Sequence, residues 1–375
     1  MSHFQKFNMQ HKDQLSVLIA PLDWGLGHAT RCTPIIKELI NQGTRVIIAS
    51  AGPQKALLSA EFPGLELVDL PGYAIRHKQG LFLKWGLVFQ TPSILKQIKR
   101  ENQWLADFIQ THKPDAVISD NRYGLYHPDV YCVFLTHQLA IRTGLGSLVN
   151  HFILKWNYSF IRKFSACWIP DWPGAISLAG KLSHPTTKPP VPTRYVGILS
   201  RLKPFPVKPE KNTLLILISG PEPQRTDFEK CVLSQLENLF LQCTVVRGLP
   251  GMASPGSIST DGIHIVNHLP AEELNVLMNA SDLIVTRSGY SSIMDLVQLA
   301  RNGILVPTPG QAEQEYLGNH MQEMNWMVCV PQKNFNLKKA ILKFRGSILT
   351  LPQKEEPQLG NVVEELISHC NNAKR

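Results

Sequence analysis

Residues 15–31, LSVLIAPLDWGLGHATR, join a short apolar run to a turn with two glycines and then to a stretch typical of a helix. The run 15–20 predicts a buried strand, and the helix predicted over 30–42 ends before Gly43, a residue that suits a helix C-terminus. A strand that passes through a glycine turn into a helix is typical of a parallel sheet covered by helices. The stretch therefore indicates an α/β fold.

The same alternation continues along the chain and restarts after a proline-rich passage at 184–192. Because 375 residues exceed one ordinary core, we expect two doubly wound, Rossmann-like domains, 1–190 and 191–350, that face each other across a cleft. A C-terminal helix follows within 351–375, and packing against the first domain is one option for it. Ligands of such sheets bind beyond the carboxyl ends of the strands.

Composition is that of a globular protein, with 43% hydrophobic and 18% charged residues. The first twelve residues contain no apolar signal segment, and no apolar run reaches the length of a membrane span. The seven cysteines are scattered singly, which favours reduced thiols over a disulfide frame or a zinc site. We therefore expect a cytoplasmic protein.

The formal net charge of +9 is concentrated in the N-terminal half. Segments 81–104 and 151–164 mix Trp, Phe and Leu with Lys and Arg, which suits peripheral docking on the anionic inner face of a cell membrane. Core helices with basic outer faces explain them equally well. No nucleic-acid module is recognisable, so we predict no nucleic-acid partner.

The glycine turn differs from a dinucleotide loop. Gly25 and Gly27 are followed by Thr30 where a third glycine would stand, and the strand predicted over 45–50 does not end on a carboxylate. NAD binding is therefore disfavoured, and a turn without any ligand is the plain alternative. His28 lies at a helix N-terminus, which lowers the pKa of an imidazole and suits a general base. Asp120, after another strand, could orient that imidazole, bind acceptor hydroxyls or cap its own loop.

A second constellation is residues 281–295, SDLIVTRSGYSSIMD. Here an apolar strand runs into Arg287, and hydroxyl groups follow in the first turn of a predicted helix. Free N–H groups and hydroxyls at a helix N-terminus can bind phosphate, and an acid one turn later can hold a diol. A serine-capped amphipathic helix is the alternative. The candidate ligands are Ser288, Gly289, Ser291, Ser292 and Asp295.

Further polar residues follow other strand ends. In the second half, Gln311, Gln314 and Glu315 could bind sugar hydroxyls or form a solvated helix face, and Gly220 precedes Arg225. An arginine in a first helical turn opposes the helix dipole and so favours an anionic partner, although a surface arginine is equally plausible. In the first half, the candidate acceptor-binding residues, which could also be loop or helix caps, are Asp23, Trp24, Arg122 and His137.

Taken together, these motifs resemble the GT-B glycosyltransferases of family 28, and in particular their uncharacterised MurG-like branch. By that resemblance, Ser292 contacts the donor diphosphate and Asp295 the ribose. Backbone groups around Val266 and His268 hold the nucleobase, while Gln314 and Glu315 meet the donor sugar and Arg225 a phosphate.

The sequence departs from the family pattern at three places. Pro221–Pro223 replaces a second glycine-rich loop, Asp295 replaces a glutamate, and Glu315 stands where a second glutamine is common. The resemblance implies transfer, with inversion, of a hexose or N-acetylhexosamine from a nucleotide-diphosphate donor, with UDP the expected nucleotide. The acceptor is a hydroxyl on a small or lipid-linked molecule.

His28 is the first choice of general base and Asp120 the second. We expect no metal and no cofactor, because the strand ends of the second half carry no DxD motif. A nucleotide-sugar 2-epimerase of the same fold and a non-catalytic nucleotide-sugar or lipid-binding protein are the alternatives.

Overall fold

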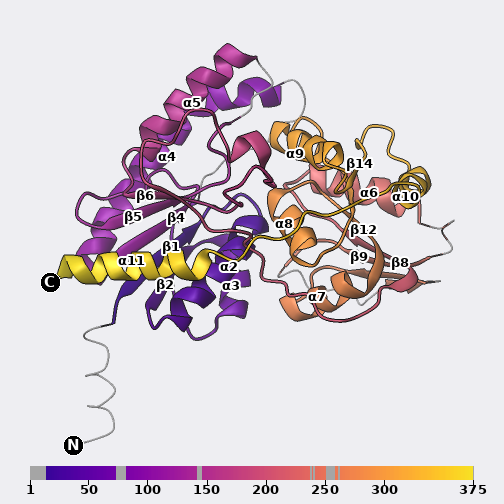
Figure 1. Cartoon of the computed structure of the whole chain (residues 1–375), viewed down its shortest axis with the longest axis horizontal. Helices are drawn as coiled ribbons and strands as arrows, with labels where there is room; N and C mark the ends of the chain where they lie inside the picture. Colours follow the sequence, from indigo (N-terminus) through magenta and orange to yellow (C-terminus); the bar gives the residue numbers. More distant parts are fainter. Residues whose placement is uncertain are drawn as a thin grey trace, which may run out of the picture.

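The computed structural model describes residues 14–72, 82–141, 146–236, 239, 241–250, 258–260 and 262–374. Two seven-stranded sheets, each with helices packed around it, lie side by side (Figure 1). This arrangement confirms the predicted fold class, two doubly wound Rossmann-like α/β domains.

The first sheet has the strand order β3-β2-β1-β4-β5-β6-β7, and all of its pairs are parallel. Both β1 and β4 are buried along their whole length, as expected for strands covered on both faces. The chain leaves β1 in one direction and returns beside it as β4, so the carboxyl ends of these two strands flank a crevice. The strands are β1 (Ser16–Pro21), β2 (Arg45–Ser50), β3 (Glu66–Asp69), β4 (Ala116–Asp120), β5 (Tyr131–Leu135), β6 (Ala166–Ile169) and β7 (Thr193–Tyr195), and the helices are α2 (Leu26–Asn41), α3 (Gly52–Glu61), α4 (Phe82–His112) and α5 (Ser147–Ile161).

The second sheet has the order β10-β11-β9-β8-β12-β13-β14, in which only the β10–β11 pair of the described strands is antiparallel. Its crevice lies between β8 and β12, which pair in parallel. The strands are β8 (Glu210–Leu217), β9 (Gln242–Val246), β10 (Ile258–Thr260), β11 (Ile263–Val266), β12 (Ser281–Thr286), β13 (Ile304–Leu305) and β14 (Val328–Cys329), and the helices are α6 (Gln224–Leu233), α7 (Ala271–Ala280), α8 (Tyr290–Gln298), α9 (Ala312–Glu323), α10 (Leu337–Arg345) and α11 (Leu359–Lys374).

The first sheet extends past the expected boundary at residue 190. Strand β7 pairs with β6 through Cys167 and Thr193, and the second sheet starts only at Glu210. The proline-rich passage is thus a connection within the first unit and not the linker between two units. A strand of three residues has too few apolar positions to be recognised from sequence, so the predicted boundary lies before β7 and not after it.

The C-terminal helix α11 lies against the first sheet, far from α10 that precedes it (Figure 1, yellow). Val363 and Leu366 join a hydrophobic cluster that also contains Leu39 of α2. A salt bridge holds the outer side of α11, because Lys374 Nζ lies 2.8 Å from a carboxylate oxygen of Asp115. Nothing in the described part of the chain is a helix both long and apolar enough to cross a bilayer.

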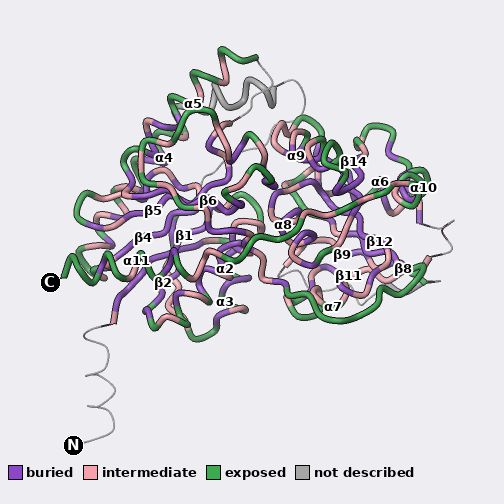
Figure 2. The backbone as a smooth tube through the Cα atoms, in the orientation of Figure 1, coloured by how far each residue is buried: buried purple, intermediate pink, exposed green. Residues whose placement is uncertain are grey.

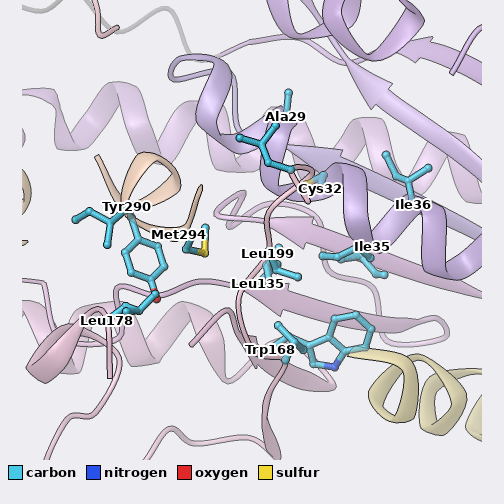
Figure 3. Packing of buried hydrophobic residues seen from close by; sticks show 14 of the residues in the cluster. Ala29, Cys32, Ile35, Ile36, Leu135, Trp168, Leu178, Leu199, Tyr290 and Met294 are labelled. Atoms are coloured by element: carbon cyan, nitrogen blue, oxygen red, sulfur yellow. The ribbon is translucent and has the colours of Figure 1, made fainter. Parts of the chain in front are cut away.

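One hydrophobic cluster continues from the first sheet into the second. Ile35 of α2, Leu178 of the loop after β6, and Tyr290 and Met294 of α8 all belong to it (Figure 3). Figure 2 shows buried backbone running through the junction between α2 and α8. The Tyr290 hydroxyl donates a hydrogen bond of 2.6 Å to the carbonyl of Pro170. The two halves therefore share part of one core.

The loop after β6 depends on the buried carboxylate of Asp171. Its oxygens accept hydrogen bonds from the backbone N–H groups of Trp172 (2.8 Å), Leu178 (2.9 Å) and Ala179 (2.9 Å) and from the Ser183 hydroxyl (2.6 Å). Buried N–H groups without acceptors are costly, so this one side chain holds the loop in the shape that meets α8.

We predict that Asp171→Ala lowers the free energy of unfolding by about 3 kcal/mol, because several buried donors lose their acceptor together. Urea denaturation measures the change. The matched control is Asp129→Ala, whose side chain is 85% exposed, and which should change stability by less than about 0.5 kcal/mol. Equal effects for the two variants would contradict this role of Asp171.

Candidate active site

Two helix N-termini meet at the junction of the two sheets. Helix α2 begins at Leu26 after Gly25, and α8 begins at Tyr290 after Gly289. Neither helix has a side-chain cap on its first N–H groups. Gly25 has a φ of +87°, a left-handed conformation that favours glycine. Uncapped N–H groups with the positive end of the helix dipole form a natural anion site.

The two N-termini are in direct contact. The Ser291 hydroxyl donates a 2.9 Å hydrogen bond to the Gly27 carbonyl. A Cβ atom at position 27 would lie 2.8 Å from the Ser291 oxygen, so a side chain here would displace that hydroxyl from its hydrogen bond. The glycine turn predicted from sequence thus lies in contact with the start of α8, and glycine at residue 27 leaves room for this contact.

Beside this contact, His28, Arg31 and Asp120 form a buried polar cluster. The spacing of three residues places His28 and Arg31 on one face of α2, and β4 ends next to β1 with Asp120. The Nδ1 atom of His28 is 2.9 Å from Oδ2 of Asp120, and Arg31 donates from Nε to the same oxygen at 3.0 Å and from NH2 to Oδ1. The His28 side chain keeps 16% exposure, whereas Asp120 is fully buried.

The electrostatics of the cluster suit a general base. Burial lowers the pKa of His28, and the positive charge of Arg31 lowers it further, against the opposing effect of Asp120. Burial alone would raise the pKa of Asp120, but Arg31 and His28 outweigh it and the pKa lies below its ordinary value. A neutral imidazole beside an ionised carboxylate is the form that accepts a proton from an alcohol.

The cluster continues into the second half of the chain through His137. Arg31 NH1 lies 3.2 Å from Nδ1 of His137, whose Nε2 lies 2.7 Å from Oε1 of Glu313 on α9. The His137 ring also stacks on Tyr290, with centroids 4.0 Å apart. His137 is 2% exposed, so the structure places it as a bridge between the two halves and not on an open acceptor surface. Sequence reasoning did not identify Arg31 as a site residue, although its spacing from His28 was the available signal.

On the donor side, Asp295 lies one turn after Ser291 and Ser292 on α8. Its Oδ1 accepts a hydrogen bond of 2.5 Å from the Ser200 hydroxyl. Burial raises the pKa of Asp295 to about 6. Both Ser291 and Ser292 are half-buried, and His268, beyond Val266 at the end of β11, has its pKa lowered by burial and by Arg201. The acid that the sequence predicts to bind a diol therefore already accepts a hydrogen bond from one hydroxyl group.

Several predicted donor ligands hold their own loops together. The Ser288 hydroxyl donates to the Gln314 carbonyl (2.7 Å), and the Gln314 side-chain oxygen accepts from the Thr308 N–H (2.9 Å). Glu315 accepts from the Gly310 N–H at 2.9 Å. The Arg287 guanidinium lies over the Phe228 ring, 4.1 Å from its centroid, and burial lowers its pKa to about 10. The side chains of these residues are thus engaged in contacts within the second half of the chain, and these contacts fix the shape of its loops.

Unpartnered polar atoms mark the same place. At the end of β12 and in the segments that follow β8, β12 and β13, five buried side-chain atoms of the described residues have no hydrogen-bond partner in the structure. Buried polar atoms are normally paired, so this concentration indicates a place where a polar ligand completes the bonding. The atoms are Gln224 Oε1, Thr286 Oγ1, Arg287 Nε, Thr308 Oγ1 and Gln311 Oε1.

Arg225, in the first turn of α6, is bound by one carboxylate of the preceding loop and one of the same helix. Glu222 lies 2.5 Å from its Nε and Glu229 lies 2.6 Å from its NH1. The loop after Gly220, which has a φ of +114°, turns Glu222 back over the helix start. The unfavourable position of an arginine in a first helical turn is therefore offset within the chain, and we assign Arg225 to the structure of this loop instead of to a phosphate.

Arg122 is likewise internal. It is fully buried, with Glu101 Oε1 2.6 Å from its NH1 and the Pro21 carbonyl 3.0 Å from its Nε. An acceptor cannot reach it, so the acceptor-binding role predicted for Arg122 is wrong. Asp23 lies 3.5 Å from the same guanidinium. Trp24, the residue after Asp23 in the loop between β1 and α2, is 41% exposed.

An apolar stripe lies on the outer face of α5, which projects from the first sheet (Figure 1). Leu148, Phe152 and Trp156 are 78%, 70% and 40% exposed and follow each other at intervals of four residues. Lys155, Arg162 and Lys163 are exposed beside them, and α5 contains no acidic residue. Of the predicted segment 81–104, residue 81 and the side chains of 82–91 lie outside the described residues.

Known proteins resemble this chain in sequence and in fold. Residues 227–369 match the glycosyltransferase family 28 C-terminal domain. An uncharacterised glycosyltransferase of Methanosarcina acetivorans is 24% identical over 80% of this chain and 82% of its own length. A UDP-N-acetylglucosamine–N-acetylmuramyl-(pentapeptide) pyrophosphoryl-undecaprenol N-acetylglucosamine transferase of Methylobacterium is 25% identical over 78% of this chain and 77% of its own.

Among solved structures, the crystal structure of MurG from Acinetobacter baumannii superposes with a TM-score of 0.51 at 15% identity and covers 95% of both chains. The glycosyltransferase SnogD from Streptomyces nogalater gives a TM-score of 0.61 at 14% identity, over 96% of this chain and 100% of its own. At such identities, these superpositions show the fold. Together, the family match, the sequence relatives and the two-sheet architecture support a GT-B glycosyltransferase of the family-28, MurG-like type, an enzyme that transfers a sugar from a nucleotide-sugar donor to an acceptor.

Proposed function

We propose that this enzyme transfers an N-acetylhexosamine or hexose from a UDP-linked donor to an acceptor hydroxyl with inversion at the anomeric carbon. The observation that carries the proposal is the 2.9 Å contact between His28 and Asp120, placed where the uncapped ends of α2 and α8 meet. UDP-N-acetylglucosamine is the first donor to test, because it is the donor named for the Methylobacterium relative.

In the proposed reaction the acceptor O–H gives its proton to Nε2 of His28. The acceptor oxygen forms a bond to the anomeric carbon as the bond from that carbon to the diphosphate oxygen breaks, and the electron pair leaves with the diphosphate. Asp120 holds the imidazole by accepting from Nδ1–H and stabilises the imidazolium that results. Attack opposite to the leaving group gives inversion.

The leaving diphosphate gains charge as the bond breaks. The N–H groups at the start of α8, with the hydroxyls of Ser291 and Ser292, are proposed to stabilise that charge, and the proposal requires no metal ion. The unpartnered atoms of Thr308 and Gln311 then have the sugar as their partner. Asp295 is proposed to hold the ribose, in the way that it already accepts the Ser200 hydroxyl.

His28→Ala should lower kcat by about 10²- to 10⁴-fold, the usual contribution of a positioned general base. The Kd for UDP-N-acetylglucosamine should stay within about twofold, because the ring is proposed to contact the acceptor and not the diphosphate. Transfer to an acceptor hydroxyl and calorimetric donor binding measure the two effects. Full activity in His28→Ala would eliminate the base assignment, and conversion of the donor without any acceptor would favour an epimerase.

Donor affinity should depend on the ionisation of Asp295. Its pKa of about 6 means that the carboxylate is charged above that pH and protonated below it. We therefore predict that Kd for UDP-N-acetylglucosamine, whose esterified phosphates do not titrate in this range, rises up to about tenfold from pH 7.5 to pH 5. Asp295→Asn should bind more weakly at pH 7.5 and show a flatter profile. The same pH dependence in both proteins would remove Asp295 from the ribose site.

We also propose that α5 docks on an anionic membrane surface, which would bring a lipid-linked acceptor to the enzyme. The exposed stripe of Leu148, Phe152 and Trp156 supports this, because an amphipathic helix with basic neighbours binds at a lipid interface. The basic residues supply attraction to anionic lipid, which falls as salt is added.

Replacing all three stripe residues by serine should reduce co-sedimentation with vesicles that contain phosphatidylglycerol by about tenfold or more, because the apolar anchor is lost. The matched control replaces Leu342 and Ile348, which are 62% and 91% exposed elsewhere on the surface, and should sediment like the unmodified enzyme. Unchanged sedimentation of the stripe variant, or equal sedimentation with neutral phosphatidylcholine vesicles, would contradict docking through α5.

A further inference from the structure

The Nδ1 atom of His28 has two close neighbours that make opposite demands on it. Oδ2 of Asp120, at 2.9 Å, can only accept a hydrogen bond, so this contact requires a proton on Nδ1. NH2 of Arg31, at 2.7 Å, can only donate, so this contact requires a lone pair on Nδ1. A neutral imidazole satisfies one of them and not both.

Which of these two contacts Nδ1 makes decides whether Nε2 of His28 presents a lone pair or a proton to the acceptor. When Nδ1–H donates to Asp120, Nε2 carries a lone pair and can take a proton. When Nδ1 accepts from Arg31, the ring proton is on Nε2, which then presents a donor and cannot act as a base. The position of one guanidinium therefore controls whether the base is available.

Arg31 is itself held from the other half of the molecule. Glu313 on α9 accepts at 2.7 Å, which fixes the proton of His137 on Nε2 and leaves Nδ1 of His137 as an acceptor for Arg31 NH1 at 3.2 Å. The ring of His137 is kept in this orientation by stacking on Tyr290 of α8. Both supports of His137 come from the second sheet's helices, so they are present only when the two halves are together.

We propose that Arg31 is a positioning residue that sets the tautomer and basicity of His28, and that Glu313 and His137 make this setting depend on contact between the two halves of the enzyme. The inference rests on the proposed role of His28. The charged and titratable groups around the imidazole are Arg31 of α2, Asp120 of β4, His137 after β5 and Glu313 of α9. Contact with Glu313 holds NH1 of Arg31 on His137 and so limits how strongly NH2 acts on His28, so that deprotonation of the acceptor is tied to the closed arrangement.

Arg31→Gln tests the proposal through the pH profile of kcat/KM. Loss of the cation leaves Asp120 unneutralised beside His28, so the pKa of His28 rises and its active, neutral form is lost at a higher pH. The acid limb of the profile should move to higher pH by about one unit. On this limb kcat/KM is then about tenfold lower than in the unmodified enzyme, and on the plateau the difference is smaller. Arg31→Lys, which keeps the charge, should have its acid limb close to the pH at which it lies in the unmodified enzyme.

Glu313→Gln should move the limb in the opposite direction, to lower pH, by a smaller amount, because His137 then holds Arg31 less firmly and the Arg31 cation acts more strongly on His28. Glu323→Ala, an exposed position on the same helix, is the matched control and should leave the profile unchanged. A purely structural role for Arg31 predicts an equal loss of rate at every pH. That result, or an unshifted limb in Arg31→Gln, would overturn the proposal.

A second measurement separates this inference from the proposed function. In protein labelled with ¹⁵N histidine, the two ring nitrogens of His28, assigned by their absence in His28→Ala, report the tautomer directly. Arg31→Gln should shift the population toward the Nδ1–H form and raise the titration midpoint of His28. If His28 proves not to be the base, these shifts still occur; if they are absent, the control by Arg31 is wrong whatever the role of His28.

Discussion

The carboxylate of Asp120 is the group on which the rest of the site depends. A fully buried charge is tolerated only when it is paired and hydrogen-bonded, and here His28 and Arg31 supply the partners from one face of α2. The pairing requires that α2 start close to the carboxyl end of β1, next to β4. The doubly wound order of the sheet provides this geometry, because β1 and β4 are neighbours although they lie far apart in sequence.

The same helix start also sets the relation between the two halves. Gly27 allows Ser291 to approach, Tyr290 packs into the shared core, and His137 and Glu313 extend the polar cluster into α9. The proposed catalytic chemistry and the packing of the halves therefore use the same few residues. If His28 is the base, this arrangement links its protonation to contact with the second half without a separate regulatory element.

The sequence was informative where the pattern was long and local. The strand before the glycine turn, the helix after it and the strand–helix unit around Ser291 lie where the apolar periodicity indicated. Helix α2, however, starts at Leu26 and not at residue 30, because Gly27, a residue that argues against a helix by propensity, lies in its first turn and contacts Ser291 of α8. Strands β6, β7 and β10 were missed, since three or four residues carry no measurable period.

Side-chain partners were the least predictable part of the site. Arg122 and Arg225 have the same residue type as a phosphate or acceptor ligand, but Glu101 and Glu229 bind them in the fold. Such pairings depend on tertiary contacts that spacing alone does not reveal. Arg31 was the opposite case, because its distance of three residues from His28 already placed it on the same helix face.

The donor diphosphate is proposed to bind at the start of α8, beside His28. A crystal structure of the enzyme with UDP bound tests this placement most directly. We expect β-phosphate oxygens about 3 Å from the backbone N–H groups of Ser291 and Ser292, with the ribose hydroxyls on Asp295. A diphosphate bound at the loop of Arg225, or on the first sheet away from α8, would contradict it.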